Sequence, residues 1–320
     1  MNRSKAAASL VALPDTVFAL DCVRPDFLFL RIVSRSLILW EEVEPTIAWI
    51  ESQMPTVVQY YFDKFRKKAE KVSGLEGLAT FAAMSMSVDG QGKDVEMVGN
   101  VQPINANSVA ENPNPETSMK EETEMNVDYN SIRQAHAYIT AGLCFSLGLR
   151  FAGTGNESAR EVIYSKIIEL QRLRDGSDSV STALRPDMPT VELCLGSAAI
   201  SLAMVMAGTG DLKVFRLLKA LRWKCDMDVK YGNHCAYASA IGLLFLGGGT
   251  CTLGNEAADT AALLVSFFPR YPIFTHDNRY HLQALRHLYA LAVKERKVEA
   301  IDVDSNEKIL LPMSVSAFLS

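Results

Sequence analysis

The chain has 320 residues, of which 48% are hydrophobic, and its formal net charge is -5. This length and composition are sufficient to bury at least one substantial core and are typical of one or two domains. Residues 86–127 hold eight acidic residues against two lysines, which leaves the remainder of the chain close to neutral. These counts indicate no basic face, so they argue against nucleic acid as the main partner.

The N-terminal part is expected to be helical after an extended leading segment at residues 1–23. That segment lacks the apolar core of about 7 to 15 residues that marks a signal peptide. Pro25 and Asp26 suit the first turn of a helix over residues 27–40. Apolar side chains recur along that helix at steps of three and four and predict one buried face: Phe27, Leu30, Val33, Leu37 and Trp40.

Two further helices are predicted to start at prolines, one at Pro45 and one at Pro55. The second ends in the sequence Arg66-Lys67-Lys68. Cations stabilise a helix C-terminus, so we interpret this cluster as a solvated helix end rather than a binding patch. Residues 86–127 then lack aromatic side chains and any apolar period, and we interpret them as a disordered acidic insertion.

After the insertion, one sequence pattern occurs three times: an apolar helix rich in small residues, a glycine turn and an amphipathic helix. Aligned on Gly153, Gly208 and Gly248, the copies are 55 and 40 residues apart. Removing about fifteen residues of a polar stretch at 174–190 restores a period near 40, which is typical of two-helix solenoid repeats. The fold class is therefore predicted to be an all-α solenoid, a partial toroid of helix-turn-helix repeats.

The glycines of the three turns are predicted to take positive φ values at helix ends, where other residues are strained. They are Gly153, Gly155, Gly208, Gly210, Gly247, Gly248 and Gly249. A fourth helix is expected over residues 278–293. On it, Arg279, Tyr280 and Arg286 are expected either to fix loops of the array or to contact a neighbouring subunit.

None of the motifs that suggest chemistry meets its full requirement. The Gly-Thr-Gly turns lack the Gly-Lys-Ser/Thr of a phosphate loop and follow helices rather than strands. A calcium loop starting at Asp302 would need glycine at its sixth position and glutamate at its twelfth, and Glu307 and Met313 stand there.

Cysteine and histidine spacings are equally weak as site signals. The zinc candidates lack paired close ligands: Cys225, His234, Cys235 and Cys251. No CxxC occurs, so buried thiols in a reducing compartment are expected. We predict no catalytic residue, cofactor or metal, and expect a soluble intracellular protein.

Several phrases carry a resemblance to a known family. SLAMVMAGTGDLKV, GLLFLGGGT, DNRYHLQALRHLYALA and VRPDFLFLRIVSRSLILWEEVEPTIAWI resemble the family of the largest scaffold subunit of the anaphase-promoting complex (cyclosome), in and before its proteasome/cyclosome repeats. The resemblance covers roughly residues 11–60 and 130–305. Family members are several times longer, so the chain is expected to be a fragment, an excised domain or a truncated product. Whether its repeats close into a full ring is left open.

This resemblance implies a non-catalytic scaffold of a cullin-type ubiquitin ligase that controls the metaphase–anaphase transition and mitotic exit. Its implied partners are the other subunits of that complex, including the cullin-containing catalytic module and substrate-recognition factors. The resemblance implies no nucleic-acid or membrane partner. It also implies a location in the nucleus and the cytoplasm. Two alternatives remain: a scaffold of the proteasome regulatory cap, or a small helical thiol-dependent enzyme using Cys235. The resulting domains are an N-terminal helical segment (1–85), the insertion (86–127), the repeat array (128–309) and an atypical tail (310–320).

Overall fold

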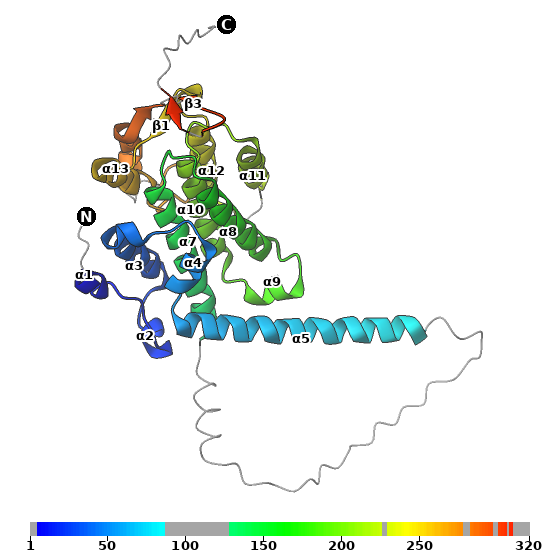
Figure 1. The fold of residues 1–320 in the computed structure, drawn as a ribbon. Coiled ribbons are helices and arrows are strands. Elements are labelled where there is room, and N and C mark those ends of the chain that lie inside the picture. Colours follow the sequence, from blue (N-terminus) through cyan, green and yellow to red (C-terminus); the bar gives the residue numbers. More distant parts are fainter. Residues whose placement is uncertain are drawn as a thin grey trace, which may run out of the picture. The chain divides into compact units, whose positions relative to one another are not determined.

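The computed structural model describes residues 5–86, 128–225, 229–277, 282–296, 300–305 and 307–309, and these residues are mainly helical (Figure 1). Within these ranges, strand occurs only as two antiparallel pairs of two or three residues per strand. The first pair is β1 (Cys251–Leu253) with β2 (Val293–Glu295), and the second is β3 (Ala300–Ile301) with β4 (Lys308–Ile309). The all-α prediction is confirmed. The predicted acidic insertion, apart from residue 86, and the predicted tail lie outside the described residues.

The chain divides into two compact units, each made of two separate stretches of sequence. The first unit comprises Met1–Leu143 and Ser165–Leu195. The second comprises Cys144–Tyr164 and Gly196–Ser320. All of the predicted glycine turns therefore belong to the second unit.

The first unit begins with short helices where extended chain was expected. α1 (Lys5–Ser9) and α2 (Val17–Asp21) both lie within residues 1–23. The side chain of Thr16 caps α2 by accepting a hydrogen bond of 3.2 Å from the backbone N–H of Ala19. The expectation was wrong because helices of five residues are shorter than the window over which hydrophobic periodicity can be recognised.

α3 (Pro25–Ile38) confirms the helix expected over residues 27–40, and η1 (Trp40–Glu42) follows it. Its buried face agrees with the predicted one only in part. Val33 and Trp40 are buried as predicted, but Phe27 and Leu30 are 43% and 44% exposed, and Phe29 and Ile32 are at most 2% exposed. Apolar side chains occupy most of the circumference of α3, so periodicity alone does not determine which side faces the core.

α4 (Ile47–Gln53) is followed by α5 (Thr56–Met86), a single long helix (Figure 1). α5 does not end at Arg66-Lys67-Lys68, as the sequence suggested. Residues 69–86 contain no proline and many good helix formers, so nothing there terminates the helix. Near its start, the ring of Phe62 stacks on His136 with 3.7 Å between ring centroids.

The remaining helices begin at residue 129 and follow in chain order. They are α7 (Tyr129–Arg150), α8 (Glu157–Asp175), α9 (Ser179–Leu184), α10 (Met188–Val205), α11 (Leu212–Trp223), α12 (Tyr231–Leu244), η2 (Leu246–Gly249), α13 (Ala257–Phe267), α14 (Leu282–Leu285) and η3 (Arg286–Ala292). The helix predicted over residues 278–293 is thus only partly present. Residues 278–281 lie outside the described residues, η3 is a tighter 3-10 helix, and Val293 begins β2.

Small residues let helix backbones approach closely in the core of the second unit. A Cβ added to Gly148 of α7 would lie 2.8 Å from the Cα of Ser201 in α10. Ser201 itself satisfies its buried hydroxyl by donating to the carbonyl of Ser197 at 2.7 Å. The cost of glycine in a helix interior, about 1 kcal/mol relative to alanine, is offset here by close helix packing.

α10 is by length and composition apolar enough to cross a membrane. However, 83% of its 18 residues are buried inside the protein, as in the core helix of a water-soluble fold.

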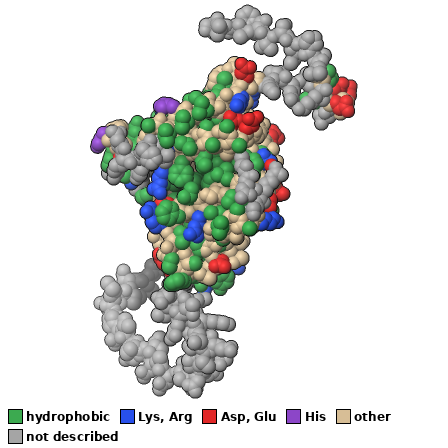
Figure 2. Space-filling view, turned by 90° about the vertical axis from the view of Figure 1, so that its left-hand side faces the viewer, with side chains coloured by type: hydrophobic (Ala, Val, Ile, Leu, Met, Phe, Trp, Pro, Cys, Tyr) green, Lys and Arg blue, Asp and Glu red, His purple; other side chains and the backbone are tan. Residues whose placement is uncertain are grey.

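On the face drawn in Figure 2, Lys and Arg side chains lie in separate spots among apolar and neutral side chains, and they form no continuous basic area there.

Candidate functional site

Two Gly-Thr-Gly turns lie in the second unit. Their four glycines have φ values of +67° (Gly153), +63° (Gly155), +71° (Gly208) and +62° (Gly210). Only glycine takes this left-handed conformation without strain. The first turn connects α7 to α8, and the second connects α10 to α11.

Each turn donates its backbone N–H groups to the end of the first helix in the next repeat. Gly153 and Gly155 donate to the carbonyls of Met204 and Val205 at 2.8 and 2.9 Å. One repeat later, Gly208 and Gly210 donate to Leu243 and Leu244, both at 3.0 Å. The last carbonyls of a helix have no partner within that helix, so each turn satisfies the helix end that follows it. We call this pattern the turn ladder.

The space beside the turn ladder is also filled by protein. A Cβ on Gly153 would lie 2.0 Å from the carbonyl oxygen of Leu253, and one on Gly208 would lie 1.9 Å from that of Cys251. Both carbonyls belong to β1. Thr252, between them, donates its hydroxyl to the carbonyl of Gly153 at 2.8 Å. The amides that a phosphate would need are therefore occupied by backbone carbonyls, which supports a structural role for these turns.

The third turn is built differently. Gly247, Gly248 and Gly249 have φ values of +58°, +63° and +94°, but a Cβ on Gly248 would meet nothing within 4 Å. The hydroxyl of Thr250 donates to the carbonyl of Gly247 at 2.7 Å, as Thr154 and Thr209 do to the carbonyls three residues before them. The structural equivalent of Gly208 is therefore Gly249, and the alignment on Gly248 was displaced by one residue.

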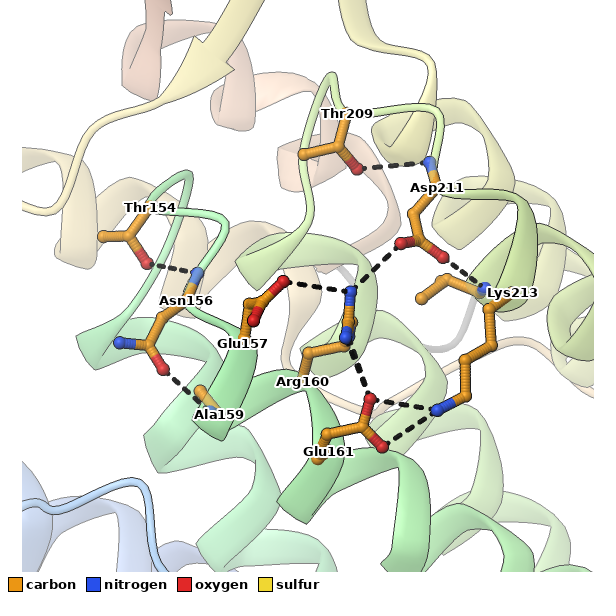
Figure 3. Close-up of polar contacts among 10 residues, drawn as sticks. Thr154, Asn156, Glu157, Ala159, Arg160, Glu161, Thr209, Asp211 and Lys213 are labelled. Atoms are coloured by element: carbon orange, nitrogen blue, oxygen red, sulfur yellow. Dashed lines mark hydrogen bonds and ion pairs between the residues drawn. The ribbon is translucent and has the colours of Figure 1, made fainter. Parts of the chain in front are cut away.

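A cluster of charged side chains links the helices that follow the first two turns (Figure 3). Asn156 and Asp211, which come directly after the turns, cap α8 and α11 by accepting from Ala159 and Val214, both at 2.8 Å. Arg160 of α8 then pairs with the capping carboxylate of Asp211 at 3.2 Å and with Glu161 at 3.0 Å. The cap of one repeat is thereby tied to a helix of the preceding one.

Lys213 completes this charged cluster. Its Nζ lies 2.9 Å from both carboxylate oxygens of Glu161 and 4.7 Å from the ring centroid of Tyr164. The hydrogen bond from Lys213, assisted by one from Arg160, holds the pKa of Glu161 below its ordinary value. Every charge in the cluster has a partner of opposite sign, so the cluster is arranged to join repeats rather than to perform acid–base chemistry.

Of the three residues singled out on the predicted fourth helix, Arg279 and Tyr280 lie outside the described residues. Arg286 donates to the carbonyls of Ser266, Phe268 and Arg270 at 2.8, 3.2 and 2.6 Å. Its guanidinium also lies 4.0 Å from the ring centroid of Tyr271. Through these contacts it holds the loop after α13 in place.

Cysteine and histidine side chains are not gathered into a site in the described part of the chain. There, no group of three His, Cys, Asp or Glu side chains could hold a metal ion. Cys225 and His234 line the same cavity on the α11–α12 surface, while Cys235 and Cys251 are half-buried elsewhere. Asp302 accepts hydrogen bonds from the backbone N–H groups of Ser305 and Asp304, and these bonds lower its pKa. Such bonds are typical of an ordinary turn.

Sequence reasoning missed the charged cluster. Its signal is an Asn or Asp directly after each Gly-Thr-Gly, followed four residues after Asn156 by Arg160. An N-cap residue placed after a glycine turn is a readable pattern. The pairing of Arg160 with a carboxylate 51 positions later is set by the stacking of repeats and has no local signal.

Comparison with known proteins identifies similar chains. A family model described as the APC1 fifth domain matches residues 2–294. Anaphase-promoting complex subunit 1 of Arabidopsis thaliana is 35% identical over 98% of this chain, and the match covers 16% of that relative. The human protein of the same name is 35% identical over 95% of this chain, and the match covers 13% of that relative. A protein of Emericella nidulans named negative regulator of mitosis is 32% identical over 98% of this chain and 12% of its own length. The chain thus spans less than a fifth of these relatives.

Proposed function

This chain belongs to the family described as the APC1 fifth domain, and from that premise we propose that it acts as a non-catalytic scaffold module of the anaphase-promoting complex. In this role it would hold other subunits in position while ubiquitin transfer takes place elsewhere. The observation that carries the proposal is the family match over residues 2–294, which includes the whole turn ladder.

The structure of the second unit supports a scaffold role on physical grounds. In stacked repeats, each unit is stabilised mainly by its neighbours, and the outer surface stays available for binding partners. The turn ladder and the charged cluster both connect one repeat to the next. The backbone amides of the Gly-Thr-Gly turns, whose sequence most resembles a ligand-binding loop, are occupied by the hydrogen bonds of the turn ladder. A rigid array of this kind can position partners without contributing chemistry of its own.

The proposed partners are other subunits of the same complex, including the cullin-containing catalytic module and substrate-recognition factors. Their activity at the metaphase–anaphase transition and mitotic exit would place the chain in the nucleus and the cytoplasm. The relatives named above support this assignment over a proteasome-cap scaffold, because their names refer to the anaphase-promoting complex or to mitosis. A thiol enzyme has no comparable support: the names of these relatives refer to no such activity, and no group of metal-binding side chains occurs among the described residues.

Affinity purification of the tagged protein, followed by identification of bound subunits, tests this proposal. We expect subunits of the anaphase-promoting complex, with the cullin-containing one among them. Enrichment of proteasome ATPase-ring subunits instead would contradict the proposal. The variant Gly208→Val, which should disrupt the turn ladder, is expected to lose these partners, while Gly248→Ala at the open third turn serves as the matched control and should keep them.

A further inference from the structure

α11 presents two contrasting faces within the second unit. One face is buried and apolar, and it consists of Val214, Leu217, Leu218 and Leu221. At 100° per residue, the positions opposite to it are Leu212, Arg216, Lys219 and Trp223. All four of these are exposed, and the side chain of Trp223 is 73% exposed. A tryptophan this exposed has no role in the core of this unit.

The exposed side of α11 is also strongly basic. Residues 212–225 contain five lysines and arginines and no acidic residue. Lys213 is neutralised by Glu161 in the charged cluster. Among the described residues, by contrast, no carboxylate forms an ion pair with Arg216, Lys219 or Arg222. Within that part of the chain, this helix therefore carries three cations without a carboxylate partner.

An apolar groove lies directly beside these cations. It has a volume of about 400 Å³, and Phe215, Trp223 and Ile241 line it together with Lys219, Arg222 and His234. Phe215 is held in place by an edge-to-face contact with Phe245, with 5.3 Å between ring centroids. Aromatic side chains and arginine around a small apolar hollow are the composition of binding hot spots in protein interfaces.

We propose that the exposed face of α11 and the adjoining groove bind an acidic linear segment of a partner protein that carries one apolar anchor residue. The carboxylates of the segment would pair with Arg216, Lys219 and Arg222, and the anchor would enter the groove against Phe215 and Trp223. This inference rests on the proposed scaffold function and deepens it by naming the chemistry of one partner.

The observations favour an acidic peptide over a nucleic acid. A polyanionic backbone needs an extended track of cations, and α11 offers three that have no carboxylate partner in the described part of the chain. Glu161 lies at the other end of the helix, against Lys213, and would repel phosphates that continued along it. A peptide needs only a few carboxylates and gains from burying an anchor side chain, which a nucleic acid backbone cannot supply.

The binding test uses the whole chain and a defined probe. α11 has 12 residues, so it is about 18 Å long, a length that an extended peptide of about six residues spans. The probe is a fluorescently labelled synthetic peptide of about eight residues, one leucine flanked by glutamates. Its binding is followed by anisotropy and by the emission of Trp223. The other two tryptophans, Trp40 and Trp49, are 7% and 9% exposed, so a change in emission reports mainly on this site.

We expect saturable binding that weakens as the salt concentration rises, because surface ion pairs are screened. The double variant Arg216→Glu/Lys219→Glu should weaken binding by about tenfold or more, since two attractive charge pairs become repulsive. The matched control is Lys67→Glu/Lys68→Glu, which makes the same charge change at two exposed positions of α5 and should leave binding unchanged. Replacing the leucine of the peptide by glycine, or Trp223 by alanine, should also weaken binding.

Equal affinity for the two double variants, or no saturable binding at low salt, would overturn the inference. Tighter binding of a single-stranded oligonucleotide that also depends on Arg216 would overturn it in favour of nucleic acid. If only a variant lacking residues 87–126 bound the peptide, the site would be occupied by the chain's own acidic segment and not by a partner. The proposed scaffold function is scored separately, because co-purification of complex subunits with Arg216→Glu/Lys219→Glu would uphold it even if the peptide failed to bind.

Discussion

The second and third glycine turns have similar sequences and similar backbone angles, yet their surroundings differ. Gly208 and Gly248 have φ values of +71° and +63°. A Cβ on Gly208 would lie 1.9 Å from the carbonyl oxygen of Cys251, whereas one on Gly248 would meet nothing within 4 Å. Glycine is therefore required at Gly248 for its conformation alone, but at Gly208 for its conformation and for close packing. A glycine-rich motif thus does not show by itself how much stability it carries.

The substitution Gly208→Val should have the largest effect on the free energy of unfolding. It combines left-handed strain, which is severe for a β-branched residue, with a collision against backbone that cannot move independently of β1. We expect a loss of roughly 4 kcal/mol or more, a size reached only by a few mechanisms. Chemical denaturation measures it. An unchanged stability combined with the loss of a small-molecule activity would indicate a ligand loop.

Thr252→Val should lower the free energy of unfolding by less than Gly208→Val does, and by more than the same substitution at the third turn. It removes the hydroxyl that donates to the carbonyl of Gly153 and keeps the shape of the side chain. Leaving that carbonyl without its donor should cost about 1 to 2 kcal/mol. The control is Thr250→Val, whose hydroxyl bonds locally, to the carbonyl of Gly247 and beside the Sγ of the adjacent Cys251. If Thr250→Val proved the more destabilising of the two in thermal unfolding, β1 would not be the element that locks the ladder.

Asp211→Ala tests the link between a turn and the helix that follows it. The substitution removes the N-cap of α11 and the carboxylate that pairs with Arg160. N-cap removal costs about 1 kcal/mol in most helices. Asp211→Asn keeps the cap and removes only the charge, so it should retain most of the stability. Equal losses for both variants in denaturant titrations would show that the ion pair, and not the cap, matters.

The pair of Glu161 with Lys213 should contribute least among the contacts of the cluster. Both side chains are about half exposed, and such pairs contribute roughly 0.2 to 1 kcal/mol. Because Lys213 lowers the pKa of Glu161 from its ordinary 4.5, the contribution is complete above that value and is lost as the pH falls through the lower folded pKa. The stability difference between the wild type and Lys213→Met should therefore shrink below about pH 4.5. A difference that grows on acidification would contradict this sign.

Deletion of residues 87–126 should change the stability of the turns least of all. The segment has no apolar period or aromatic side chain, and shortening a loop of this length changes closure entropy only slightly. We expect a melting temperature close to that of the wild type. A loss above about 2 kcal/mol, which is rare for changes outside a core, would mean that the segment contributes to packing.

Much of the fold could be predicted from the sequence because its signals are local. Repeated apolar helices, glycines at helix ends and an Asn or Asp after each turn depend on a few adjacent residues. What could not be predicted depends on distant contacts. β1 pairs with β2 across more than 40 residues, in the register Cys251 with Glu295, and this pairing converts the end of the expected fourth helix into strand. The pairing of Arg160 with Asp211 has the same origin.

The lesson of the candidate site is similar. The glycines of the turns were correctly predicted to have positive φ values, but their presence alone did not show that Gly208 packs against β1 and that Gly248 does not. Length also set a limit: α1 and α2 are too short to produce a period. The one-residue error in aligning the third turn arose because three consecutive glycines offer no side chain to fix the register.

The most direct test of the account compares Gly208→Ala with Gly248→Ala in the same chain. Both glycines have φ values between +60° and +75°, so the conformational cost of alanine, about 1 kcal/mol, is shared and cancels in the difference. Equilibrium unfolding should show that Gly208→Ala is less stable than Gly248→Ala by at least about 2 kcal/mol, the cost of forcing a methyl group against backbone. Equal stabilities would contradict the claim that the packed turns form the structural ladder of this repeat array.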